Sequence, residues 1–152
     1  MINNAFYRIN EYGIKIGYDG EAITEVSFSD EFHGKTSPLS DLAASQLKEY
    51  FQGKRKVFDL PLKISGTPFQ EKVWRELMNI PFGETRTYKD IAIAIGNPKA
   101  SRAVGMANNR NKIAIIIPCH RVIGADGGLT GYAGGLDIKE KLLLLEKNVF
   151  LM

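Results

Sequence analysis

The chain has 152 residues, of which 44% are hydrophobic and 24% charged, a composition typical of an ordinary globular protein of one domain or two small ones. No apolar run, residues 113–117 included, is long enough to span a bilayer, and the N-terminus lacks the pattern of a signal peptide, so we expect a cytoplasmic protein with no membrane contact. The net charge of +3 is compatible with nucleic acid without requiring it, and one Cys and two His argue against a disulfide or a metal site.

The first part of the chain, residues 1–64, predicts a small α+β unit. Residues 6–10, 12–18 and 22–28 alternate or cluster like short strands, with a turn at Asp19-Gly20. Ser40 is the expected cap of a helix over residues 41–52 that stops at Gly53. Pro61 then suggests an edge strand or the end of a strand. We find no motif here to which chemistry can be attached.

Residues 64–66 are the expected linker, and we take residues 65–152 as the second unit. Thr67, Pro68 and Gln70 read as a helix start, with Thr67 as the cap and Gln70 completing a capping box. The apolar side chains of this helix recur at helical spacing and predict one inward face: Phe69, Val73, Trp74 and Leu77. Residues 81–83 are expected to end the helix.

Two short helices are expected next, one over residues 88–95 after a Thr87 cap and one over residues 98–108 after Gly96. Their spacing fits a helix-turn-helix or a plain helical hairpin in a core. The second helix combines cations with small residues: Lys99, Ala100, Ser101, Arg102, Ala103, Gly105, Ala107 and Arg110. Because these side chains are small, the helix can come close to a nucleic-acid backbone, or it can pack closely against another helix with Arg102 in solvent.

The chemistry centres on the segment Pro118-Cys119-His120-Arg121. It follows residues 113–117, which predict a buried strand that would hold a reactive group rigidly. A lone Cys is usually a small buried hydrophobe. A reactive thiolate needs a base or cation nearby, and His120 and Arg121 are of the right types, with a bound water able to bridge any gap.

A glycine-rich loop and a last helix complete the chain. Six glycines from Gly124 to Gly135 surround Tyr132, which suits close backbone approach to a flat ligand or a plain surface loop. Asp137 is the expected cap of a helix over residues 138–147 in which residues 142–145 are core. Glu146 is expected to be partly exposed, and it either is solvated or orients His120.

Four segments together resemble the O6-alkylguanine-DNA alkyltransferases (methylated-DNA–protein-cysteine methyltransferases): GETRTY at 83–88, SRAVGMANN at 101–109, PCHRVIG at 118–124 and LTGYAGG at 129–135. The resemblance extends from about residue 67 to residue 146. It implies an α+β fold, in which a small ribonuclease-H-like α/β domain (1–64) precedes a mostly helical domain with a helix-turn-helix (65–152).

The resemblance implies a role for each residue of the active site. Cys119 would accept the alkyl group, His120 would take its proton through a water, and Glu146 would orient His120. Tyr88 would donate to guanine N3, and Asn111 would be the hinge that ties the helix-turn-helix to the active-site segment. The carbonyls of Cys119 and Val122 would accept from the exocyclic amine, and the Ala133 amide would meet O6. The substrate pocket would comprise Val122, Tyr132, Ala133 and Gly134.

The family's mode of action gives the expected partner, alkylated double-stranded DNA read through the minor groove. Arg102 would fill the gap left by the flipped nucleotide, and the other DNA contacts would come from Lys99, Ala100, Ser101, Ala103, Arg110 and Arg121. Transfer from O6-alkylguanine, with O4-alkylthymine as a second candidate, would be irreversible and occur once per protein. We expect no cofactor and a monomer.

Two departures and two alternatives accompany this expectation. Lys112 stands where the family usually has Pro, which would loosen the turn and add a cation; the thiol ligands of a zinc site found in some relatives are absent. A DNA-binding module that flags damage would leave Cys119 unmodified. A thiol hydrolase using Cys119 and His120 would turn over, although no separate oxyanion element is apparent.

Overall fold

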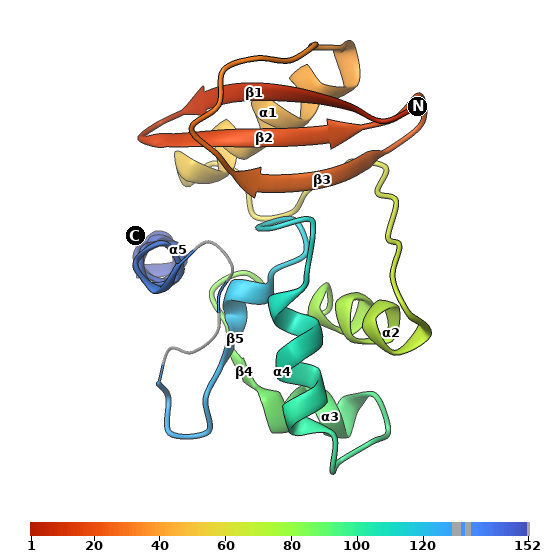
Figure 1. Ribbon diagram of the computed structural model, residues 1–152. Helices are drawn as coiled ribbons and strands as arrows, with labels where there is room; N and C mark the ends of the chain where they lie inside the picture. Colours follow the sequence, from red (N-terminus) through yellow and green to blue (C-terminus); the bar gives the residue numbers. More distant parts are fainter. Residues whose placement is uncertain (129–131, 133–134, 152) are drawn as a thin grey trace. The chain divides into compact units, whose positions relative to one another are not determined.

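The computed structural model describes residues 1–128, 132 and 135–151, without the side chains of residues 149–151. It divides into two compact units, Met1–Ile64 and Ser65–Met152. Strands and one helix make up the first unit, and helices predominate in the second (Figure 1). The α+β class expected from the sequence is confirmed.

The first unit is built on an antiparallel meander of β1 (Asn3–Ile9), β2 (Tyr12–Tyr18) and β3 (Ile23–Phe28). The β1–β2 register pairs Ile9 with Tyr12 across a tight turn, in which Asn10 has a φ of 55°, a conformation that Asn tolerates. The turn predicted at Asp19 is confirmed, because the Asp19 carboxylate accepts from the backbone amides of Glu21 and Ala22.

Helix α1 (Pro38–Phe51) covers the sheet of the first unit. The helix begins earlier than predicted: Ser37 is the N-cap, and Ser40 is the third helical residue, whose hydroxyl closes the capping box. The predicted end is confirmed, since Gly53 has a φ of 74° directly after the helix. The segment around Pro61 lies at the sheet edge, where Leu62 forms a parallel bridge with Ile23.

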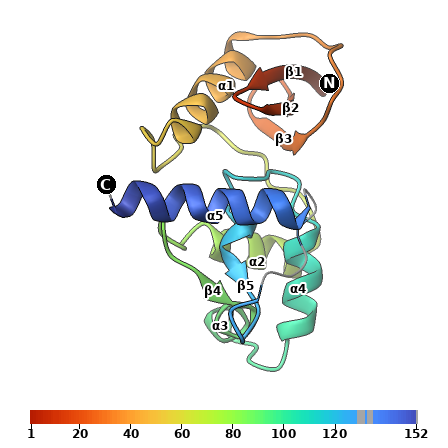
Figure 2. The ribbon, with the colours of Figure 1, turned by 90° about the vertical axis from the view of Figure 1, so that its left-hand side faces the viewer.

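The second unit packs α2 (Pro68–Leu77), α3 (Tyr88–Ala94) and α4 (Ser101–Asn109) against one another (Figure 2). The predicted capping box at Thr67 and Gln70 is confirmed. Trp74 is buried on α2 and donates from Nε1 to the carbonyl of Ala107 on α4 at 2.8 Å, which fixes the two helices relative to each other.

Two predicted elements of this unit are wrong in extent or kind. The second helix of the pair begins at Ser101 and not at residue 98, because residues 97–100 form a turn closed by the Ala100 amide on the Asn97 carbonyl. Residues 113–117 are buried as expected, yet they form a turn instead of a strand. The Ile117 amide bonds the Ile113 carbonyl, and Ile115 has a φ of 72°, which no strand contains.

The C-terminal helix α5 (Leu136–Leu151) lies beside the segment that carries Cys119 (Figures 1 and 2). Asp137 is in its first turn and is not the residue before the helix. Of the predicted core residues 142–145, Leu142 is buried whereas Leu144 is 48% exposed, since helical spacing turns Leu144 away from the core. Within the described residues, no helix is both long and apolar enough to cross a membrane.

Candidate active site

Cys119 begins a 3₁₀ turn, η1 (Cys119–Arg121), and is 5% exposed. Asn111 holds the preceding turn together. Its Nδ2 donates to the Ile117 carbonyl at 2.8 Å, and its Oδ1 accepts from the Ile113 amide at 3.0 Å. These bonds close the turn without the Pro that the family usually has after this Asn, and Lys112 in its place is exposed. Cys119 therefore lies between two turns of hydrogen-bonded backbone, the Asn111-closed turn before it and the 3₁₀ turn that it begins.

A buried carboxylate lies behind the Cys-His-Arg segment. Glu146 of α5 is 1% exposed, which corrects the expectation of partial exposure. Its Oε2 lies 2.6 Å from His120 Nε2, and its Oε1 accepts from Arg121 Nε at 2.8 Å and from the Gly83 amide at 3.1 Å. This burial excludes the solvated alternative for Glu146, and the contact with His120 is the one that the orienting role requires.

The carboxylate fixes which nitrogen of His120 is basic. Because Nε2 faces Glu146, the proton belongs on Nε2, and Nδ1 is left as the acceptor. Within the described residues, Nδ1 has no hydrogen-bond partner. Burial lowers the pKa of His120, which favours the neutral ring. Burial also raises the pKa of Glu146, but the hydrogen bonds from His120 and Arg121 and the charge of Arg121 outweigh it and lower that pKa to about 2. A neutral base with an ionised orienter is thus the state at neutral pH.

The thiol is not activated in the way that the sequence suggested. Burial raises the pKa of Cys119 to about 11, against lowering contributions from an Asn111 hydrogen bond and from the charge of Lys139. Lys139 of α5 is itself fully buried, donates to the Val122 carbonyl at 2.6 Å, and has a pKa lowered by burial. If the thiol loses its proton, the thiolate lies near the buried ammonium of Lys139. That positive charge stabilises the thiolate and partly offsets the effect of burial on the pKa.

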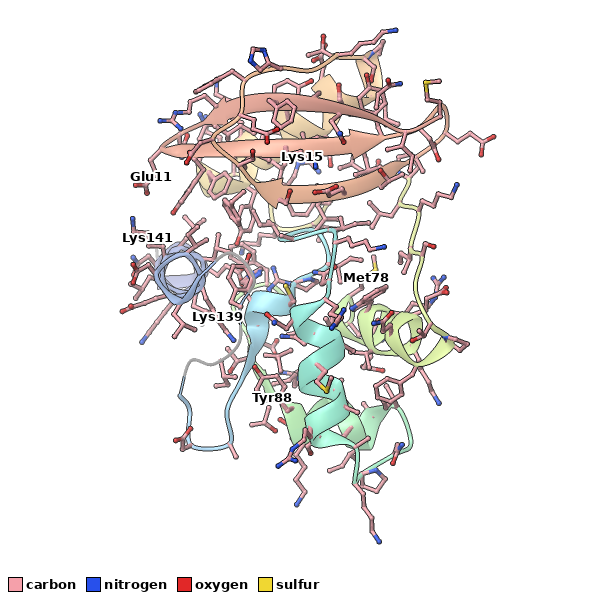
Figure 3. All side chains as sticks on the ribbon, viewed as in Figure 1. Glu11, Lys15, Met78, Tyr88, Lys139 and Lys141 are labelled. Atoms are coloured by element: carbon pink, nitrogen blue, oxygen red, sulfur yellow. The ribbon has the colours of Figure 1, made fainter. Side chains whose placement is uncertain are left out.

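A short parallel pairing places Tyr88 beside the chain that follows Cys119. Strand β4 (Arg86–Thr87) pairs with β5 (Val122–Ile123), so that Tyr88 follows β4 next to the residues that follow Cys119. A Cβ on Gly105 would stand 3.7 Å from the Tyr88 ring, which places this ring against α4 (Figure 3). The side chain of an Ala at this position would be in ordinary van der Waals contact with the ring.

The predicted DNA-contacting residues divide into two groups. Lys99, Arg102, Ala103 and Arg110 are exposed, and Ala100 and Ser101 are half-buried. Arg121 is different, and its inclusion is corrected: it is 6% exposed, and its guanidinium is bonded to Glu146 and to the Ile80 carbonyl. Its charge is used inside the protein and is not available to a phosphate.

The predicted pocket is described in part. Val122 and Tyr132 are buried, whereas Ala133 and Gly134 lie outside the described residues. In the part of the chain that the structure describes, no group of three or more His, Cys, Asp or Glu side chains is arranged to hold a metal ion.

Two polar residues of this site were missed from the sequence, and both had a signal. Lys139 lies three residues before Leu142 and seven before Glu146, so all three share one face of α5. Asn108 lies on the inward stripe of α4 with Val104 and is 1% exposed; its Nδ2 donates to the Cys119 carbonyl at 3.3 Å. A polar residue on an apolar helical stripe marks a candidate buried site.

A buried thiol backed by a neutral His, an ionised Glu and a buried Lys is the arrangement of a protein whose cysteine is a nucleophile. The sequence matches the description "6-O-methylguanine DNA methyltransferase, DNA binding domain" over residues 68–148 and the ribonuclease-like domain of the same family over residues 14–64. The chain belongs to the 6-O-methylguanine DNA methyltransferase family.

Relatives support this membership at high similarity. The methylated-DNA–protein-cysteine methyltransferase of Methanosarcina barkeri is 69% identical over 106 residues, which cover 70% of this chain and 67% of the relative. The crystal structure of Mycobacterium tuberculosis O6-methylguanine methyltransferase is 41% identical and superposes with a TM-score of 0.87, covering 97% of this chain and 94% of the other. A structure of the M. tuberculosis OGT in complex with DNA superposes with a TM-score of 0.82 at 42% identity, over 97% and 93% of the two chains.

Proposed function

We propose that this protein repairs alkylated DNA by moving the alkyl group from O6 of guanine to Cys119, once and irreversibly. The observation that carries the proposal is the buried Cys119 within a site that holds a neutral base, an ionised orienter and a buried ammonium. The DNA-bound relative and the names of the high-identity relatives support the same reaction.

In the proposed step, the Cys119 sulfur forms a bond to the alkyl carbon while the bond between that carbon and O6 breaks. The electron pair of the broken bond passes to the guanine, and Tyr88 would give a proton to N3 to neutralise it. The thiol proton passes through a water to His120 Nδ1, whose other nitrogen is held by Glu146. A thioether has no easy leaving group, so the protein would not return to its starting state and needs no cofactor.

For the DNA interface we propose the exposed face of α4, in a helix-turn-helix with α3. Its exposed residues recur at helical spacing and combine two cations with small or uncharged side chains: Arg102, Ala103, Met106, Asn109 and Arg110. Lys99 adds a cation in the turn before the helix. Because the target oxygen of guanine is buried in the base stack, the nucleotide must leave the helix, and we assign to Arg102 the filling of the gap, with the minor groove as the side of approach.

The test is mass spectrometry after mixing the protein with a short duplex that carries one O6-methylguanine. We expect one added methyl on the peptide containing Cys119, saturating at one per protein, with the guanine restored. Cys119→Ala is the matched control and should bind the duplex without any mass change. Transfer by that variant would contradict Cys119 as the acceptor; an unmodified wild type that binds the lesion would indicate a damage-flagging module, and repeated product release a hydrolase.

Two further measurements test the DNA interface. Arg102→Ala should slow the reaction with duplex more than the reaction with free O6-methylguanine base, and equal losses would count against a flipping role. Binding should weaken as salt rises, because each phosphate contact releases counterions. A flat salt response would remove the case for the α4 face.

A further inference from the structure

A buried amide of α4 is bonded to the backbone of the proposed nucleophile. Asn108 is 1% exposed and donates from Nδ2 to the Cys119 carbonyl at 3.3 Å. That carbonyl belongs to the peptide group that joins Cys119 to His120. The bond therefore acts on a peptide plane whose rotation would move the proposed nucleophile relative to its proposed base.

The other contacts around this peptide are of two kinds. The ring of His120 is held by Glu146, at 2.6 Å from Nε2 to Oε2. The Cys119 amide bonds the Ile117 carbonyl at 2.7 Å, and the Cys119 carbonyl also accepts from the Val122 amide, so both backbone partners lie within three residues along the chain. Asn108 lies eleven residues before Cys119, and its bond ties the peptide to the packed helices of the second unit.

A comparison with another buried amide indicates that Asn108 contributes little to stability. Gln46 of α1 is 5% exposed, and both ends of its amide are paired: Nε2 donates to the Asp59 carbonyl at 3.0 Å, and Oε1 accepts from the Asp59 amide at 2.9 Å. Within the described residues, Asn108 Oδ1 is buried and has no hydrogen-bond partner. An unpaired buried acceptor destabilises a fold by at least as much as one hydrogen bond stabilises it. An apolar side chain would therefore serve folding equally well at this position.

We propose that Asn108 is a positioning residue for methyl transfer: its amide holds the peptide between Cys119 and His120 so that one water can bridge the sulfur and Nδ1. This inference rests on the proposed function. Loss of the amide should slow the transfer step itself, because a small displacement of reacting groups lowers a rate steeply. Affinity for DNA should stay the same, since Asn108 is buried and the exposed face of α4 does not change.

The experiment uses Asn108→Leu, which removes the donor and keeps the branching of the side chain. It measures the affinity for a duplex that carries O6-methylguanine, the first-order rate of methyl transfer at saturating duplex, and the midpoint of urea unfolding. We expect the rate to fall about tenfold and the dissociation constant to change by less than about twofold. The urea midpoint should stay equal or rise, because the unpaired Oδ1 is removed together with the bond.

Free O6-methylguanine base gives a second readout that a DNA-contacting role would not produce. Because the displaced groups belong to the protein, Asn108→Leu should slow the reactions with duplex and with free base by the same factor. Arg102→Ala, in contrast, should slow the reaction with duplex more.

Gln46→Met is the matched control, since it removes a buried amide with two hydrogen bonds from the first unit. It should lower the urea midpoint and leave the transfer rate below the unfolding transition unchanged. The pair of variants thus separates the loss of stability from the loss of rate.

Several outcomes overturn the inference. An unchanged transfer rate in Asn108→Leu would exclude a positioning role. A rate that falls only together with the urea midpoint would make Asn108 a structural residue, and a loss of duplex affinity alone would make it part of the DNA interface. If the Leu variant does not fold, Asn108→Ala gives the same comparison, because it removes the donor without adding volume. Failure of the wild type to transfer methyl would instead overturn the proposed function.

Discussion

Both units of this protein have exposed ion pairs, but among the described residues only the second unit, which also has the exposed pairs Arg75–Glu71 and Arg86–Glu84, buries ion-paired side chains. In residues 1–64, the ion pairs Lys15–Glu25, Arg55–Glu49 and Lys63–Asp19 have at least one partner that is a quarter or more exposed. In residues 65–152, Glu146 is 1% exposed and is bonded to a buried Arg and a buried His, with a buried Lys on the same helix. Water screens the charges of the exposed pairs, whereas the charge of Glu146 is compensated by the protein groups bonded to it.

This difference teaches where to look for chemistry. Exposed pairs contribute about 0–1 kcal/mol and perturb few properties of their members. Burial destabilises charged groups and shifts their pKa values: it raises that of Cys119 and lowers that of His120, whereas the hydrogen-bonding neighbours of Glu146 lower its pKa. The same residue types therefore form solvated pairs in both units and a buried cluster in the second unit alone.

The strongest way to break the comparison is Glu146→Gln. Loss of the carboxylate leaves Arg121 buried without its counter-charge, so we expect about 3–5 kcal/mol of destabilisation in urea unfolding. Methyl transfer should fall at least about 100-fold, because His120 also loses its orienter. Glu49→Gln, the matched change in the exposed pair with Arg55, should lose less than about 1 kcal/mol. Similar losses for both variants would show that burial does not distinguish the units.

Acid should expose the same contrast. The folded pKa of Glu146 lies near 2, below its usual value, so its contribution is present above about pH 4.5 and is lost as the pH falls towards 2. The lowered pKa of His120 has the same sign, because the unfolded chain binds a proton below about pH 6.5 that the buried ring resists. From Glu146 alone we expect a loss of about 2 kcal/mol between pH 7 and pH 3, and His120 adds to that loss in the same direction.

Trp74 offers the readout for this acid transition, since the single Trp of the chain is buried in the second unit. Its fluorescence should follow urea unfolding at each pH. The loss should be smaller in Glu146→Gln. An unfolding free energy that does not change with pH in the wild type would contradict the assigned charge states.

Lys139→Met tests whether a buried ammonium in the second unit affects the Cys119 thiol more than an exposed ammonium in the first unit does. Without the buried ammonium, the pKa of Cys119 should rise further, and the rate of thiol alkylation at neutral pH should fall about tenfold. The pH dependence of alkylation with a small reagent checks the shift directly. Lys63→Met, which removes a 61% exposed ammonium from the first unit, should leave both quantities unchanged. A tenfold slower rate with an unaltered pH profile would mean that Lys139 acts on structure alone.

The smallest effects are expected where the units resemble each other. Ser37→Ala and Thr67→Ala each remove the side-chain oxygen of a capping box, and each should destabilise its own unit by about 1 kcal/mol. Neither change touches the buried charges, so transfer rates below the unfolding transition should stay the same. A slower rate in Ser37→Ala would give the first unit a part in the chemistry.

Local patterns predicted much of this molecule. Capping residues, Gly stops and alternating apolar residues located α2, the meander and the end of α1, because those signals act within a few residues of chain. Burial of residues 113–117 followed from their composition. The turn that these residues form could not be predicted from their apolar composition. It depends on hydrogen bonds from the Asn111 side chain and on the left-handed backbone conformation of Ile115.

The sequence predicted which residues belong to the site, but it did not predict their burial or the direction in which each side chain points. The sequence named Cys119, His120 and Glu146 together, and the His–Glu contact exists at 2.6 Å. Arg121 was placed outside because adjacency to the nucleophile does not tell which way a side chain points; it binds Glu146, 25 residues along the chain. The burial of Glu146 and Lys139 depends on how α5 packs, which is long-range information.

The high pKa of the buried Cys119 affects how readily its thiol is oxidised before it reacts. With a pKa of about 11, only about one thiol in ten thousand is ionised at pH 7, and the thiolate is the form that peroxides and disulfides attack. If Cys119 accepts one alkyl group and is not regenerated, as we propose, each thiol lost to oxidation is one repair event lost. Burial that keeps the sulfur neutral and 5% exposed slows its reaction with peroxides and disulfides.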